Sequence, residues 1–168
     1  MVKTRQPTSL KNSAIVKTLS WPDEAATAAF ARQLAQALVR AANGLHACIT
    51  LQGDLGAGKT TLVRHLLRAL GVAGRVKSPT YAVVEPYEVA DGHIWHFDFY
   101  RFSDPREWED AGFRDIFASP GLTLCEWPQN AEGVMPHPDL DIHIQVGDDD
   151  QRSVTLHAHT ARGQALLG

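Results

Sequence analysis

The sequence predicts a single α/β domain, and three observations support that prediction. The chain has 168 residues, the usual length of one domain with one hydrophobic core. Residues 46–51 form a short apolar run that leads into a glycine-rich segment, and leucines at helical spacing follow over residues 62–70. Two apolar runs between residues 81 and 100 flank Asp91-Gly92, a strong signal for a hairpin of antiparallel strands.

The first predicted helix covers residues 25–42. Ser20 lies three residues before Asp23, as in a capping box at a helix N-terminus. Alanines and larger apolar residues then recur at helical spacing, and Asn43-Gly44 is a typical helix stop.

The second half of the chain predicts mainly strands. Residues 122–126 form a short apolar run, and residues 140–146 and 153–159 alternate apolar and polar side chains. Pro86 indicates an edge strand or a bulge, because proline cannot donate to a strand ladder. The acidic turn at residues 147–150 could be mistaken for a metal loop, but a solvated hairpin turn is the simpler interpretation.

No linker, repeat or low-complexity tract divides the chain. We expect a loose leader over residues 1–19, one domain over residues 20–160 and a tail over residues 161–168. The leader lacks the apolar core of about 7–15 residues that defines a signal peptide. No stretch approaches the roughly 20 apolar residues of a membrane span. The expectation is a cytoplasmic protein without a membrane partner.

Composition and charge narrow the function classes. The chain is 44% hydrophobic and 21% charged, which is ordinary for a globular protein. Its formal net charge of −3 argues against a large autonomous nucleic-acid surface, although not against work on an RNA held by another protein. Cys48 and Cys125 lie in apolar runs and are expected to be small buried side chains, as in a reducing cytoplasm.

Residues 53–60 carry the strongest motif. They read Gly-Asp-Leu-Gly-Ala-Gly-Lys-Thr, a full match to the phosphate-loop pattern G-x-x-x-x-G-K-[ST]. The glycines let successive backbone N–H groups point at one anion, and the following helix adds its N-terminal dipole. Lys59 is expected to reach the β- and γ-phosphates of a nucleotide, and the Thr60 hydroxyl is expected to hold Mg²⁺. The strand before the motif and the helix after it are the context that such a loop requires.

Two acids are candidates for the magnesium shell. A phosphate-loop site needs a carboxylate at the C-terminal end of a hydrophobic strand, and both Asp98 and Glu126 fit that description. An acid in such a place is costly unless a cation or hydrogen bonds compensate it. His96 shares a strand face with Asp98, but no further ligand cluster supports a zinc or iron site. His96 is therefore expected to be packed or hydrogen-bonded.

The motif set favours adenine over guanine. GTPases carry D-x-x-G after the magnesium strand, whereas residues 98–101 read Asp-Phe-Tyr-Arg, and N-K-x-D occurs nowhere in the chain. ATP is therefore the predicted nucleotide. Thr80, within Ser-Pro-Thr-Tyr at residues 78–81, either senses the γ-phosphate as a switch or caps a turn, and its spacing does not separate the two.

Together these segments resemble the bacterial TsaE (YjeE) family, the ATPases of threonylcarbamoyl-adenosine tRNA modification. Beyond the phosphate loop and Thr61, the order and spacing of the motifs agree over about residues 20–146. The combination of S-P-T-Y, F-D-x-Y-R and E-W-P is specific, and Phe99 is a conservative replacement of a commoner leucine. The segments that carry the resemblance are residues 76–81, 96–101, 113–115, 125–128 and 136–140.

The resemblance implies a small P-loop NTPase fold whose sheet mixes parallel and antiparallel strands. It also implies that the protein works with TsaD and TsaB, which install the threonylcarbamoyl group on adenosine 37 of certain tRNAs, so that tRNA is met through the complex. The implied metal ligands are Thr60, Asp98 and Glu126. The implied catalytic residues are Glu126, Lys59 and Thr80. The implied nucleotide-binding residues are Asp54, Leu55, Gly56, Ala57, Gly58, Lys59, Thr60, Thr61 and Trp127.

With this resemblance, the hypothesis is a slow ATPase whose hydrolysis of ATP drives or resets another enzyme. Lys59 and Mg²⁺ would neutralise charge on the γ-phosphate, Glu126 would orient the attacking water, and Thr80 would close over the phosphate. A small-molecule kinase is the alternative. Arg101, Arg106 and Arg114 could form the lid that such a kinase needs, but the simpler interpretation is that they are charged surface residues. A non-catalytic module that responds only to ATP occupancy is a second alternative.

Overall fold

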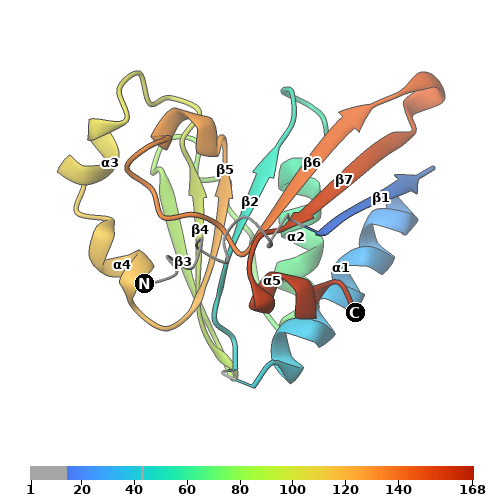
Figure 1. Ribbon diagram of the computed structural model, residues 1–168, viewed down its shortest axis with the longest axis horizontal. Coiled ribbons are helices and arrows are strands. Elements are labelled where there is room, and N and C mark those ends of the chain that lie inside the picture. The colour runs from blue at the N-terminus through green and yellow to red at the C-terminus, as the bar shows by residue number, and fades with distance from the viewer. Residues whose placement is uncertain (1–14, 43) are drawn as a thin grey trace, which may run out of the picture.

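A computed structural model of the chain describes residues 15–42 and 44–168. Seven strands form one sheet in the order β1-β7-β6-β2-β5-β4-β3, with helices on both of its faces (Figure 1). The predicted single α/β domain with a mixed sheet flanked by helices is confirmed. Within the described residues, no helix is long and apolar enough to cross a membrane.

The centre of the sheet is parallel. β2 (Ala47–Gln52) pairs in parallel with β5 (Leu122–Glu126) on one side and with β6 (Leu140–Val146) on the other, and β5 pairs in parallel with β4 (Gly92–Asp98). The carboxyl ends of these strands therefore meet along one edge of the sheet. In open α/β sheets, ligands bind outside this edge.

Both borders of the sheet are antiparallel. β3 (Val84–Val89) forms the predicted hairpin with β4 and lies at the edge of the sheet, which is where Pro86 is tolerated. At the opposite border, β7 (Arg152–Ala158) pairs with β6 and with β1 (Ile15–Trp21). The turn between β6 and β7 contains a short exposed 3-10 segment, Asp148–Asp150. The predicted solvated hairpin turn is therefore confirmed.

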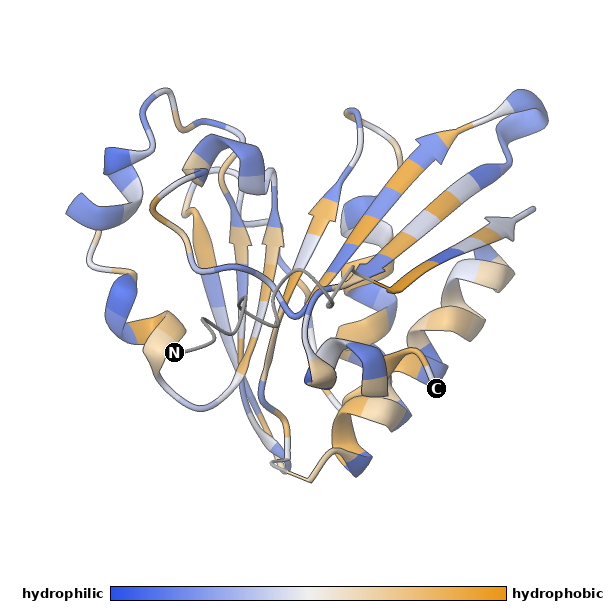
Figure 2. Ribbon diagram, viewed as in Figure 1, coloured by the Kyte–Doolittle hydropathy of each residue, from blue (hydrophilic) through white to orange (hydrophobic). Residues whose placement is uncertain are grey.

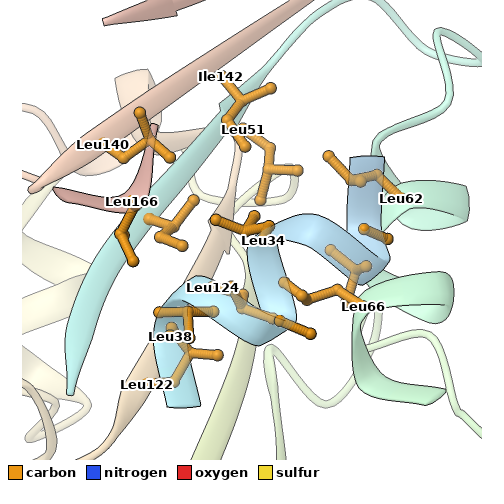
Figure 3. Packing of buried hydrophobic residues seen from close by; sticks show 14 of the residues in the cluster. Leu34, Leu38, Leu51, Leu62, Leu66, Leu122, Leu124, Leu140, Ile142 and Leu166 are labelled. Carbon is orange, nitrogen blue, oxygen red and sulfur yellow. The ribbon is translucent and has the colours of Figure 1, made fainter. Parts of the chain in front are cut away.

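One face of the sheet is covered by α1 (Glu24–Arg40) and α2 (Lys59–Ala69). Every second residue of the central strands points at these helices, so leucines from helices and strands interlock in one apolar layer. Figure 3 shows this packing. The residues labelled there are Leu34, Leu38, Leu51, Leu62, Leu66, Leu122, Leu124, Leu140, Ile142 and Leu166.

Over β3, β4 and β5, the other face is covered by short helices and turns. There α3 (Arg106–Asp110), α4 (Arg114–Ala118) and the 3-10 turn η2 (Pro128–Ala131) bury an aromatic cluster around Phe97 and Trp108. His96 and Phe97 are consecutive residues of β4, so their side chains point to opposite faces of the sheet. Both cysteines are free. Cys125 is fully buried, as predicted, whereas Cys48 is only partly buried.

The two ends of the domain extend beyond the predicted limits. Residues 15–19, assigned to the leader, are part of β1 and pair with β7, while residues 1–14 lie outside the described part of the chain. Residues 161–168, assigned to a tail, contain α5 (Ala161–Leu166), whose Leu166 is buried in the main core. Both segments are too short for their apolar residues to show a helical or a strand periodicity. Their roles become visible only in the assembled sheet, where β1 pairs with β7 and α5 packs on the main core.

The start of α1 differs in detail from the prediction. Asp23 is the N-cap, and its side chain accepts a hydrogen bond from the N–H of Ala26 at 3.0 Å. Ser20 belongs to β1 instead and pairs with Ser153. The predicted helix stop includes Asn43, which lies outside the described residues.

Candidate active site

The phosphate loop joins β2 to α2 at the carboxyl edge of the sheet. Gly53 has φ 151°, and a Cβ there would lie 2.5 Å from the carbonyl oxygen of Ile144, so only glycine fits. Gly58 has φ 111° and is the N-cap of α2. The N–H of Ala57 donates to the carbonyl of Asp54 at 3.0 Å and closes the loop. The loop thus places its backbone at a helix N-terminus, where N–H groups and the helix dipole favour an anion.

Lys59 folds back over this loop. Its Nζ donates to the carbonyl oxygen of Gly53 and, at 3.4 Å, to that of Asp54. The same atom lies 3.9 Å from the centroid of the Trp127 ring, a cation–π contact. Burial lowers the pKa of Lys59, while the negative charges of Glu126, Asp98 and Asp54 oppose that shift. A phosphate would offer this ammonium group a stronger partner than the two carbonyls.

Asp98 and Glu126 meet beside the loop. They are register partners at the carboxyl ends of β4 and β5, and both side chains are buried. The Thr60 hydroxyl donates to Glu126 Oε1 at 2.9 Å, so the first turn of α2 contacts the end of β5. Asp98 Oδ1 accepts the N–H of Tyr100 at 2.9 Å. Burial raises the pKa of Asp98; the Tyr100 N–H opposes this shift, and the charge of Glu126 adds to it.

The donor set here suits a hard divalent cation. One hydroxyl (Thr60) and two carboxylates (Asp98 and Glu126) line the same cavity, and Mg²⁺ prefers such oxygen donors. No group of three or more His, Cys, Asp or Glu side chains in the described part of the chain is placed to hold a metal alone. A cation would therefore complete its shell with phosphate and water oxygens, as Mg²⁺ usually does.

His96 fixes the orientation of Glu126. The imidazole is fully buried, and its Nε2 lies 2.6 Å from Glu126 Oε2, so the carboxylate is held between His96 and Thr60. The expectation that His96 is packed or hydrogen-bonded is confirmed. Among residues 15–42 and 44–168, no cluster of three metal-ligating side chains includes His96 and Asp98.

Two unusual backbone conformations flank the cavity. Trp127 has φ 57° and ψ 48°, a left-handed conformation that is rare for an aromatic residue, and it directs the ring over Lys59. Val83 has φ 70°, which is a genuine outlier for a β-branched residue. Its N–H donates to Pro79 at 2.7 Å and its carbonyl accepts from Asp98 at 2.9 Å. The loop that carries Thr80 is thereby fastened to the end of β4.

These residues enclose a cavity of about 280 Å³. Of the residues assigned from the sequence to nucleotide, metal or catalysis, only Asp54 does not line it, and Asp54 contributes its carbonyl to the loop instead. Tyr100 lines the cavity without having been assigned a role, and its ring packs on Trp127 with centroids 5.0 Å apart. The lining residues are Leu55, Gly56, Ala57, Gly58, Lys59, Thr60, Thr61, Thr80, Asp98, Tyr100, Glu126 and Trp127.

A second cavity, of about 160 Å³, also borders the loop. Ala57, Gly58 and Thr61 line both cavities, so the two meet at the start of α2. Arg152, from β7, lines the second cavity and donates from Nε to the carbonyl of Ala57 at 2.8 Å. Trp21, at the end of β1, contributes another wall. No local motif marks Arg152 or Trp21, because only the antiparallel border of the sheet brings them to the loop.

Comparison with known proteins agrees with this geometry. A family model described as "Threonylcarbamoyl adenosine biosynthesis protein TsaE" matches residues 21–154, most of the chain. The chain belongs to the TsaE family. The match includes the phosphate loop, Thr80, Asp98, Glu126 and Arg152, and the resemblance drawn from the motifs is confirmed.

Relatives and a solved structure support the same family. The protein named tRNA threonylcarbamoyladenosine biosynthesis protein TsaE in Haemophilus influenzae is 40% identical over 146 residues, which are 87% of this chain and 92% of the relative. The protein of that name in Bacillus subtilis is 37% identical over 118 residues, covering 70% of this chain and 73% of the relative. The crystal structure of Bacillus subtilis YdiB superposes with a TM-score of 0.72 at 30% identity and covers 91% of this chain and 93% of that one.

Proposed function

We propose that this chain is a Mg²⁺-dependent ATPase that serves the formation of threonylcarbamoyladenosine in tRNA. The observation that supports catalysis best is the contact of Thr60 with Glu126 at 2.9 Å, because it unites a phosphate-loop hydroxyl with a buried acid. The names of the relatives support the pathway. In this proposal the nucleotide phosphates lie along the loop, and Lys59 leaves its carbonyl partners to contact the β- and γ-phosphates.

The two cavities suggest where each end of ATP binds. The γ-phosphate belongs in the larger cavity, since that cavity contains the carboxylates and Thr80. The adenosine end belongs in the smaller cavity, which lies past Thr61 and offers the Arg152 guanidinium and the Trp21 ring as planar contacts. We infer adenine from the absence of guanine-specific motifs rather than from a base-specific contact.

The side chains then have distinct tasks. Lys59 neutralises charge on the transferred phosphoryl group, and Glu126 orients the attacking water and accepts its proton at a carboxylate oxygen. His96 is a positioning residue, since it acts through Glu126. Thr80 closes over the γ-phosphate. Thr60, Asp98 and Glu126 would hold Mg²⁺, which when bound supplies Lewis-acid stabilisation of the phosphate oxygens.

The geometry of Glu126 also supports slow turnover without partners. Its two oxygens are engaged by Thr60 and His96, so the carboxylate must give up or share a hydrogen bond before it can hold a water molecule. A partner that rearranges this contact would accelerate the reaction. We assign that role to TsaD and TsaB, with tRNA reached through their complex, in the cytoplasm. The net charge of −3 favours indirect contact with tRNA.

The decisive experiment is a reconstituted reaction with TsaC, TsaB, TsaD, tRNA and this chain, followed over many turnovers. We expect threonylcarbamoyladenosine to accumulate only when the chain is present and Lys59 is intact. Lys59→Ala is the test variant, and Lys17→Ala on the exposed face of β1 is the matched control. Product that forms equally well without the chain would overturn the proposed pathway role and leave only a nucleotide site.

The kinase alternative finds little support in the arginines that suggested a lid. Arg106 pairs with Asp104 at 2.8 Å and Arg114 pairs with Glu109 at 3.1 Å, all on the surface. Arg101 stacks on Tyr81 at 4.2 Å. A screen that detected transfer of phosphate to a nucleoside or sugar, at a rate above hydrolysis, would favour the kinase. ATP binding without phosphate release, even with partners present, would favour the non-catalytic module.

A further inference from the structure

A separate cavity of about 420 Å³ lies on the sheet face opposite α1 and α2. Its floor is formed by β2, β6 and β7, beyond the aromatic cluster that covers the rest of that face. Along β6 and β7, hydrophilic and hydrophobic residues alternate, so this face carries the hydrophilic set (Figure 2). It shares no lining residue with the cavity at the phosphate loop, although Gln52 directly precedes that loop. The cavity is therefore distinct from the active site.

Asp141, from β6, lines this floor. It is only 8% exposed, and its Oδ1 accepts two hydrogen bonds, from Thr50 Oγ1 at 2.7 Å and from Gln52 Nε2 at 2.9 Å. The opposite oxygen, Oδ2, has His157 Nδ1 at 3.9 Å, which is beyond hydrogen-bond distance. His157 Nδ1 is itself buried without a hydrogen-bond partner among the described residues. Asp141 Oδ2 is not among the fully buried atoms and makes no hydrogen bond within the described residues, so it can still accept one from a ligand in the cavity.

The charge of the lining points to a cationic ligand. The cavity carries the carboxylates of Asp141 and Glu132 and no lysine or arginine from the described part of the chain. An anion would be repelled. A metal ion is not favoured, since no group of three metal-ligating side chains occurs within residues 15–42 and 44–168. A cationic group with several N–H donors can satisfy the free oxygen of the Asp141 carboxylate.

The side chains that line the cavity further restrict the chemical class of the cationic ligand. The rings of His157 and His159 are stacked, with planes 10° apart and centroids separated by 6.2 Å, and both contribute aromatic surface to the cavity. A planar guanidinium stacks on such a surface, whereas an ammonium does not. Met135 and Pro138 also line the cavity, and they suit the aliphatic stem of an arginine side chain.

We propose that this cavity binds a guanidinium group, as carried by an arginine side chain. In the bound state the guanidinium N–H groups donate to Asp141 Oδ2, and the plane of the group packs against the histidine rings. The ligand is either an arginine of a partner polypeptide or a free arginine-like molecule. Both share this chemistry, and the site does not depend on the proposed ATPase activity.

The test follows the histidine ring signals of the full chain by ¹H–¹³C NMR at about pH 8, where a free imidazole is neutral. N-acetyl-arginine amide is titrated, with the uncharged N-acetyl-citrulline amide and with N-acetyl-lysine amide as matched ligands. We expect saturable shifts of the His157 and His159 signals with the arginine compound only, while His65 and His93, which do not line the cavity, stay in place. Asp141→Asn should weaken this binding by about tenfold or more, because a charge-assisted bond is lost.

Two comparisons decide the outcome. Asp148→Asn, in the exposed turn after β6, should bind as tightly as the unmodified chain. Equal shifts with citrulline, shifts absent up to saturating arginine compound, or undiminished binding by a folded Asp141→Asn variant would each overturn the proposal. If the Asp141→Asn variant misfolds, the proposal is tested by comparing the arginine and citrulline compounds on the unmodified chain. Tighter binding of a five-residue peptide with a central arginine would identify a polypeptide as the source; equal affinity would identify a free molecule.

Discussion

Replacement of Glu126 by glutamine separates nucleotide binding from turnover. The glutamine side chain has nearly the same volume, so it fits a position that is 2% exposed. Its amide oxygen can still accept from the Thr60 hydroxyl, which is 2.9 Å from Oε1 in the native structure. The amide cannot accept a proton from water, and it carries no charge for a cation. We expect Glu126→Gln to bind ATP and to hydrolyse it very slowly.

The expected magnitudes follow from these contacts. General-base catalysis contributes about 100- to 10,000-fold, so the turnover number should fall by that factor, or by about 2.7–5.4 kcal/mol of barrier. The affinity for ATP should change far less. A neutral amide oxygen replaces one charged oxygen donor near the cation that ATP carries, a loss of about 1 kcal/mol and roughly fivefold in the dissociation constant.

Phosphate release and ATP affinity are measured on the same preparations, the first by a coupled assay and the second by calorimetry. Glu88→Gln, on the exposed surface of β3, is the matched control and should leave both quantities unchanged. Turnover by Glu126→Gln within about threefold of the native rate would refute the assignment of Glu126 as the catalytic base. A loss of ATP binding as large as the loss of turnover would show that Glu126 serves mainly the bound cation.

Three further predictions rest on other contacts. Arg152→Ala should weaken ATP binding by about tenfold, because it removes a guanidinium from the wall of the smaller cavity; unchanged calorimetric affinity would contradict the placement of adenosine there. Gly163→Ala should lower the free energy of urea unfolding by about 3 kcal/mol, since the new Cβ would lie 1.9 Å from the carbonyl oxygen of Asp139; a loss below about 1 kcal/mol would show that α5 shifts freely. Trp127→Phe should remove most of the tryptophan fluorescence change on ATP addition, because ATP draws Lys59 from the Trp127 ring; a retained signal would mean that this contact persists.

Much of the fold was predictable because its signals are local. The phosphate loop is encoded by eight consecutive residues, 53–60, and the hairpin by Asp91-Gly92 between two apolar runs. Asp98 and Glu126 were predictable as a pair, since each ends an apolar strand and parallel strands bring their carboxyl ends together. The ends of the domain were not predictable, because β1 and α5 are too short for a clear period and are stabilised by the rest of the fold.

The sequence by itself determined the family, the loop and the set of acidic residues, because each depends on residue type at fixed spacing along the chain. Tertiary structure alone decided which groups from distant segments meet. His96 reaches Glu126 across two adjacent strands, Arg152 reaches the phosphate loop from 95 residues away, and Asp141 faces His157 across an antiparallel pair. Strand order and register fix these contacts. Register is set by the burial of whole faces of the sheet, a property of the assembled core rather than of any one segment.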